Sequence, residues 1–138
     1  MVFAEVFCRN GIGLIAVEIP GTGDSPALAE DPLSPDQQWS SVLDWIDADE
    51  RIDNRKLFAW GIPTGGYYTI RIAHTHSIRL LGVICHSGAC HHMFDREWLS
   101  GVDELPESFA HKWGFGNDFD KCKNEAKTLF RFFTILHK

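Results

Sequence analysis

Three short apolar runs, separated by segments with helical patterns, constrain the fold more than any other feature of this sequence. They span Gly13–Ile19, Lys56–Ile62 and Leu80–Cys85. Each run is nearly continuous in apolar residues, which is typical of parallel strands that are covered on both faces. Strand–helix–strand order with right-handed crossovers produces a parallel sheet. The sequence therefore predicts an α/β fold with three parallel strands and flanking helices.

The segments around these runs carry the helical patterns. Ser34 is suited to cap a helix, Pro35 suits its first position, and Gln37 completes a capping box. Further helices are expected at Val2–Cys8 and Gly65–His76. Apolar residues recur at helical spacing after the capping box, at Trp39, Val42, Leu43 and Ile46. We expect a core at residues 1–86 and a cap-like helical segment at residues 87–138.

Charge and hydropathy narrow the classes of function. The net charge is −6 and no cluster of Lys and Arg offsets it, which argues against a nucleic-acid partner. No apolar run reaches the ~18 residues of a membrane span. The start, MVFAEVFCRN, is too short and too charged for a signal peptide. The sequence therefore predicts a cytoplasmic protein with reduced thiols and no membrane partner.

Two weak motifs bear on cofactors. Residues 20–26, PGTGDSP, lack the Gly-Lys-Ser/Thr ending of a phosphate-binding loop. The residues that could offer soft metal ligands are Cys85, His86, Cys90, His91 and His92. A zinc site usually has a second pair of ligands further along, whereas Cys122 stands alone. We therefore expect no metal and no cofactor, and we expect the cysteines to be buried apolar side chains.

The turn in WGIPTGGYY is the most informative motif for chemistry. A nucleophile elbow, G-x-S-x-G, presents its central side chain at the end of a strand on a sharp turn into a helix. In Gly61–Gly65 that central residue is Pro63, which has no hydroxyl and whose ring fixes φ near −65°. Thr64 is the alternative nucleophile, although its β-branch resists positive φ and it needs a base. The simpler interpretation is a glycine-rich turn that only packs.

Four segments, in this order, resemble one family. They read VEIPGTGDSP, QQWSSVLDWI, WGIPTGGYYTIRIAHTH and GACHHMFDREWL. They resemble α/β-hydrolases of the fungal yellowish-green conidial-pigment type, which are relatives of the fermentation–respiration switch protein and of pseudooxynicotine-type hydrolases. The resemblance runs from about Phe3 to Leu99 and weakens after that. Members of this family shorten polyketides by hydrolysis of a carbon–carbon bond in pigment and melanin biosynthesis, with a Ser-Asp-His triad and no metal.

The resemblance implies a role for five residues. Pro63 falls on the family's nucleophile, and Thr64 falls on the position whose backbone amide belongs to the oxyanion hole. His91, His92 and Phe94 match a segment that leads into the cap over the substrate pocket. The implied substrate is a small aromatic polyketide or an ester-like molecule.

The sequence also departs from the family. The nucleophile is replaced, and the family's acid, histidine and first strands have no counterpart in these 138 residues. We therefore expect a truncated and degenerate member that is inactive by itself and that self-associates through exposed sheet edges. Two alternatives remain open. One is a residual esterase that uses Thr64, and the other is a non-catalytic module that binds a small molecule.

Overall fold

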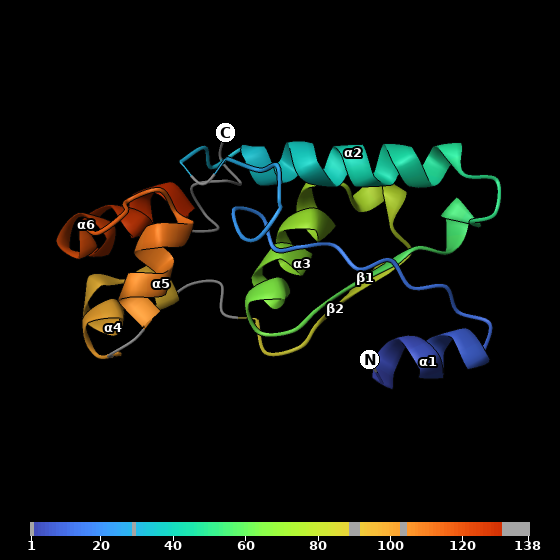
Figure 1. Ribbon diagram of the computed structural model, residues 1–138, viewed down its shortest axis with the longest axis horizontal. Helices are drawn as coiled ribbons and strands as arrows, with labels where there is room; N and C mark the ends of the chain where they lie inside the picture. The colour runs from blue at the N-terminus through green and yellow to red at the C-terminus, as the bar shows by residue number, and fades with distance from the viewer. Residues whose placement is uncertain (1, 29, 89–91, 103–104, 131–138) are drawn as a thin grey trace.

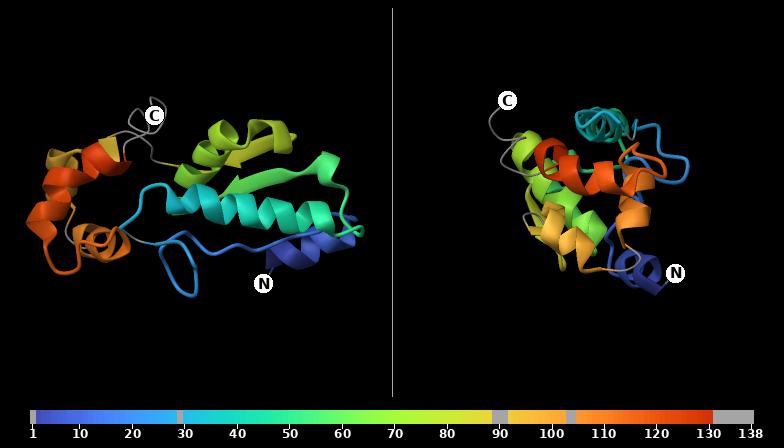
Figure 2. Two further views of the ribbon diagram at one scale, coloured as in Figure 1. Left: turned by 90° about the horizontal axis from the view of Figure 1, so that it is seen from above. Right: turned by 90° about the vertical axis from the view of Figure 1, so that its left-hand side faces the viewer.

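The computed structural model describes residues 2–28, 30–88, 92–102 and 105–130 of the chain. Figures 1 and 2 show an elongated molecule in which α4, α5 and α6 gather at one end and α1 lies at the other. The elements in chain order are α1 (Val2–Arg9), α2 (Ser34–Ala48), η1 (Asn54–Lys56), β1 (Phe58–Gly61), α3 (Thr64–Thr75), η2 (Ser77–Arg79), β2 (Gly82–Cys85), η3 (His92–Phe94), α4 (Arg96–Ser100), α5 (Leu105–Lys112) and α6 (Phe119–Phe130).

The centre of the fold is a parallel β1–α3–β2 unit. The two strands pair in register from Phe58 opposite Gly82 to Gly61 opposite Cys85. Helix α3 connects the strands and packs against both of them, with α2 lying along its outer side (Figure 1). Parallel strands thus form within the predicted runs Lys56–Ile62 and Leu80–Cys85, though each is shorter than the run, and the mixed helix–strand architecture is compatible with the α/β class.

The prediction of a third strand at Gly13–Ile19 is wrong. This segment runs as extended chain outside the sheet, which has two strands in the described part of the molecule. One of its backbone carbonyl groups bonds to a side chain of α2 and not to a neighbouring strand: Gln38 Nε2 donates a hydrogen bond to the Glu18 carbonyl oxygen at 3.0 Å. An apolar run indicates that a segment favours burial, but it cannot identify a pairing partner far along the chain. Leu14 and Ile15 are accordingly about two-fifths exposed.

The two faces of the sheet differ in cover, because successive side chains of a strand point to opposite sides. Ala59 and Val83 face the helices and pack with a cluster formed by Leu43, Ile46 and Ile72. The apolar face predicted for α2 is therefore confirmed.

The opposite face of the sheet is largely open. Trp60 is covered by α1, whose Phe3 and Phe7 rings stand edge-on to it at 5.2 and 5.7 Å. Phe58 and Ile84, by contrast, are 60% and 53% exposed. The expectation of strands covered on both faces therefore holds on one face only, because no second layer of helices among the described residues spans the other.

A second apolar cluster lies between α3 and the cap helices, by which we mean α4, α5 and α6. Tyr67 and Tyr68 supply its α3 side. The cap helices supply Leu99, Phe109, Ala110, Cys122 and Ala126, and the adjoining segments add Met93 and Phe94 from η3 and Trp113 after α5. Helix α3 thus belongs to both clusters, since Ile72 lies in the sheet-side one. The division into residues 1–86 and 87–138 stays a prediction.

Two further expectations need correction. Helix α2 begins at Ser34 with Pro35 in its first turn, but no side chain caps it. The Ser34 hydroxyl instead accepts a hydrogen bond from the Leu28 amide at 2.8 Å, so the predicted capping box is wrong. The cysteines are not uniformly buried: Cys122 is buried, whereas Cys8 and Cys85 are exposed. Cys90 lies outside the described residues.

Candidate functional site

The turn between β1 and α3 is as sharp as the sequence motif predicts. Only Ile62 and Pro63 separate the end of β1 from the start of α3. The amide of Gly65 donates to the Ile62 oxygen and that of Gly66 donates to the Pro63 oxygen, both at 2.9 Å. The helix therefore begins directly above the end of the strand.

Gly61 shows why this turn needs glycine. A Cβ atom on Gly61 would lie 2.0 Å from the carbonyl oxygen of Gly65, which no real contact allows. The strand and the first turn of the helix can approach this closely only because residue 61 has no side chain. This close strand-to-helix packing is the steric requirement of a nucleophile elbow.

Pro63 occupies the exposed tip of the turn. It is the residue before α3, with φ −4° and ψ −78°. Pro63 thus stands at the position where an elbow would present its nucleophile, but it offers no hydroxyl or thiol.

The loop after β2 closes the other side of the turn. A Cβ on Gly66 would lie 2.6 Å from the Gly88 Cα, and a Cβ on Gly88 would lie 2.3 Å from the Cys85 sulfur. Ser87, which precedes Gly88 in this loop, has a φ of 64°, the only positive value at a non-glycine residue in the described ranges. The carboxyl ends of both strands therefore meet at the first turn of α3, where ligands bind in open parallel sheets.

A small cavity opens beside this turn, under the cap. Its volume is about 10 Å³, which is room for one water molecule. The residues that line it are Thr64, Tyr67, Tyr68, Met93, Phe94, Phe109, Lys112 and Trp113. The structure thus brings Thr64 and Phe94, both predicted site residues, to one cavity. Pro63 stands outside it, and His91 lies outside the described residues.

His92 is directed elsewhere. Its Nδ1 lies 2.9 Å from Asp95 Oδ2, and Lys127 Nζ lies 2.9 Å from the other carboxylate oxygen. The hydrogen bond from His92, followed by that from Lys127, lowers the pKa of Asp95 to about 2. The His92 side chain is 79% exposed. This group connects η3 to α6 and is not part of the cavity wall.

Lys112 is the cavity residue that the sequence patterns did not single out. Its Nζ is buried and has no hydrogen-bond partner in the described part of the chain. It lies 4.8 Å from the centre of the Tyr68 ring. Burial lowers the pKa of Lys112 to about 8 and raises the pKa of Tyr68 well above its usual value. The available signal was weak: a lysine next to aromatic residues in the segment FAHKWGF.

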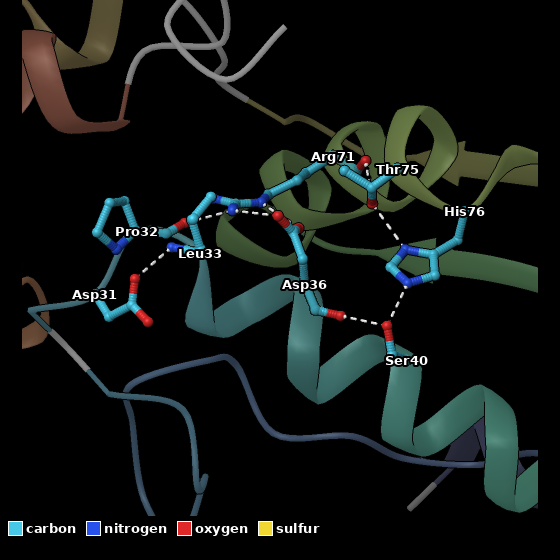
Figure 3. Close-up of polar contacts among 8 residues, drawn as sticks. All are labelled: Asp31, Pro32, Leu33, Asp36, Ser40, Arg71, Thr75 and His76. Atoms are coloured by element: carbon cyan, nitrogen blue, oxygen red, sulfur yellow. Dashed lines mark hydrogen bonds and ion pairs between the residues drawn. The ribbon is translucent and has the colours of Figure 1, made fainter. Parts of the chain in front are cut away.

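A second polar cluster connects α2 and α3 (Figure 3). The buried guanidinium of Arg71 donates to both Asp36 carboxylate oxygens at 2.7 Å, and it also donates to the Pro32 carbonyl oxygen. Nearby, Ser40 Oγ lies 2.9 Å from His76 Nε2, and Thr75 Oγ1 lies 2.8 Å from His76 Nδ1.

The Ser40–His76 contact has the distance of a nucleophile–base pair. Burial lowers the pKa of His76, which favours the neutral ring. The Ser40 hydroxyl, however, is in contact with the Asp36 carbonyl oxygen at 3.0 Å in its own helix. His76 is also about 18 Å along the axis of α3 from Thr64, at 1.5 Å per residue. We interpret this cluster as the connection between two helices.

Comparison with known proteins adds no assignment, because no protein-family model and no curated protein matches the chain. Among the residues that the structure describes, no three His, Cys, Asp or Glu side chains gather in a way that could hold a metal ion. No helix in those same residues combines the length and the apolar character needed to cross a bilayer.

Proposed function

We propose that this chain is a relative of the polyketide-shortening α/β-hydrolases that retains the elbow of the active site and has lost its nucleophile. The observation that carries the proposal is the contact of Gly61 with the first turn of α3, at the tip of which Pro63 stands. A nucleophile elbow requires a sharp strand-to-helix turn of this kind. The cap over this turn, with its aromatic lining, is consistent with the same ancestry.

The chain by itself then hydrolyses no esters. Pro63 carries no nucleophilic atom, and Thr64 lines a cavity whose described walls contain no histidine. The only amine in those walls is that of Lys112. Loss of triad members alone typically costs several orders of magnitude in rate.

An ester-turnover assay tests this proposal on the purified chain and on two variants, Pro63→Ser and Thr64→Ala. We expect all three to match the uncatalysed rate. Pro63→Ser gains nothing, because a serine without a base stays protonated and weakly nucleophilic. Turnover by the unmodified chain that disappears in Thr64→Ala would refute the proposal and favour a threonine nucleophile. Turnover gained in Pro63→Ser would reveal a base close to the tip.

The aromatic lining favours one further candidate, a non-catalytic module that binds a small aromatic molecule in the cytoplasm. The cavity holds only one water molecule in this conformation, so such a ligand requires the cap to separate from α3. A set of naphthol-like compounds that raises the melting temperature would support this candidate. No shift with any of them, at concentrations up to their solubility, would exclude it.

A further inference from the structure

The amine of Lys112 is the polar group whose position the proposed function leaves unexplained. It stands in the last turn of α5, at the point where the chain turns toward α6, and it is aimed at the face of Tyr68. Its Nζ is enclosed without a hydrogen-bond acceptor in the described part of the chain. Burying an ammonium group without a counter-charge is costly, and such groups shift toward the neutral form.

The groups that face Lys112 come from three elements. Helix α3 presents Thr64, Tyr67 and Tyr68, and η3 presents the apolar side chains of Met93 and Phe94. Phe109 and Trp113, from α5 and the residue after it, complete the wall. No carboxylate is among the lining residues that the structure describes, and burial keeps the Tyr68 phenol neutral by raising its pKa.

This environment converts an ordinary lysine into a nucleophile. A primary amine in an apolar pocket, without an acidic partner, has a far larger neutral fraction near neutral pH than an exposed lysine has, as in enzymes that form Schiff bases. The pKa of Lys112, lowered to about 8 by burial, agrees with the geometry. An exposed lysine, with a pKa near 10.4, has less than about one neutral molecule in a thousand at pH 7.

We propose that the Lys112 amine forms an imine with a small aldehyde that enters the cavity beside Thr64. The nitrogen lone pair attacks the carbonyl carbon, a carbon–nitrogen bond forms, and the oxygen becomes a hydroxyl. Loss of that hydroxyl as water, with the remaining nitrogen proton, leaves a carbon–nitrogen double bond. The step needs no oxidant or reductant.

The size of the cavity sets the class of aldehyde. A volume of about 10 Å³ holds one water molecule, so the candidates are the smallest aldehydes, of one or two carbons, which displace that water and need the smallest widening of the cavity. Lys112 and Thr64 are the residues of the wall with an amine and an aliphatic hydroxyl, and the rest of the wall is aromatic or thioether. An imine at Lys112 requires neither a hydrolase ancestry nor a nucleophile at the turn, so either proposal can fail alone.

Reductive trapping tests the proposal on the unmodified chain. Acetaldehyde at a limiting amount is added near pH 7 with cyanoborohydride, which reduces an imine to a stable ethylamine. Peptide mapping by mass spectrometry then gives the rate of ethylation at each lysine. Lys121, which is exposed and close in sequence, is the internal reference.

At pH 7 the neutral fraction of an amine with a pKa of about 8 exceeds that of an ordinary lysine about 200-fold. Burial slows access, so we expect Lys112 to be ethylated at least about tenfold faster than Lys121. The ratio should fall as the pH rises to about 10, because Lys121 gains neutral amine while Lys112 is already deprotonated. It should disappear in urea, where both side chains are solvated.

Lys112→Arg is the matched variant, since it keeps a cation but cannot form an imine. In that variant the fast-labelled peptide should be lost while Lys121 is labelled as before. Labelling of Lys112 at or below the rate of Lys121 in the folded chain would overturn the proposal. The proposal also fails if the preference persists in urea, because it would then arise from local sequence alone. If the cavity admits only a water molecule, Lys112 will be labelled at or below the rate of Lys121, which is the result that overturns the proposal.

Discussion

Gly61→Ala is the sharpest test of the elbow, because a single methyl group is placed against backbone. The added Cβ would lie 2.0 Å from the Gly65 oxygen, 2.2 Å from its carbonyl carbon and 2.6 Å from the Gly66 nitrogen. Real Cβ contacts stay beyond 3.0 Å, so the first turn of α3 must move away from β1 by about 1.0 Å, the difference between 3.0 and 2.0 Å. The atoms that must move belong to the main chain and cannot rotate away.

The loss of stability in Gly61→Ala follows from overpacking between β1 and α3. Extra methyl groups in a well-packed interior cost about 1–3 kcal/mol, and a backbone clash belongs at the upper end of that range or beyond it. We expect the free energy of unfolding to fall by about 3 kcal/mol, which lowers the melting temperature by about 10 °C in a chain of this length. Because helix α3 packs on both strands, the displacement of its first turn should destabilise the whole β1–α3–β2 unit, and the variant should still unfold in one cooperative transition.

Gly65→Ala is the matched control. It places the same methyl group four residues later, where nothing lies within 4 Å. Alanine favours a helix over glycine by up to about 1 kcal/mol, so this variant should be as stable as the unmodified chain or slightly more so. Thermal unfolding followed by circular dichroism, with urea titration, measures both variants. Equal melting temperatures for the two alanine variants would refute the close approach of β1 and α3.

The remaining predictions concern charge and exposed surface. Asp36→Ala should lower the free energy of unfolding in a urea titration by about 3 kcal/mol, because it leaves the buried Arg71 cation without its carboxylate. Asp44→Ala, on a carboxylate whose side chain is 71% exposed, should stay close to the unmodified chain. The pKa of Lys112 is about 8 in the folded chain and higher when unfolded, so between pH 8 and 9.5 the unfolded state binds more protons. Stability should therefore rise with pH by about 1 kcal/mol per unit in that window, and Lys112→Met should abolish the slope. Finally, Phe58→Ser should weaken the self-association that we expect from the open sheet face, as measured by sedimentation, and a monomeric unmodified chain at high concentration would contradict that expectation.

Local pattern predicted a large part of this fold. The spacing of Leu43 and Ile46 predicted the buried face of α2, since the 3.6-residue period of a helix is a property of the chain itself. The run before the WGIPTGGYY turn predicted β1, and the glycines after it predicted the entry into α3. The identity of Pro63, and with it the absence of a nucleophilic side chain at the tip, is likewise readable from sequence alone.

Only the tertiary structure decided the rest, because it depends on contacts between residues distant in sequence. Gly13–Ile19 has the apolar content of a strand, but whether it pairs depends on which partner the folded chain places beside it. Lys112 becomes an unusual lysine because Tyr68, forty-four positions earlier, lies under its amine and no carboxylate is among the described residues of the cavity wall. Periodicity specifies which side of an element is apolar, whereas the position of that side against another element is set by the packing of the whole chain.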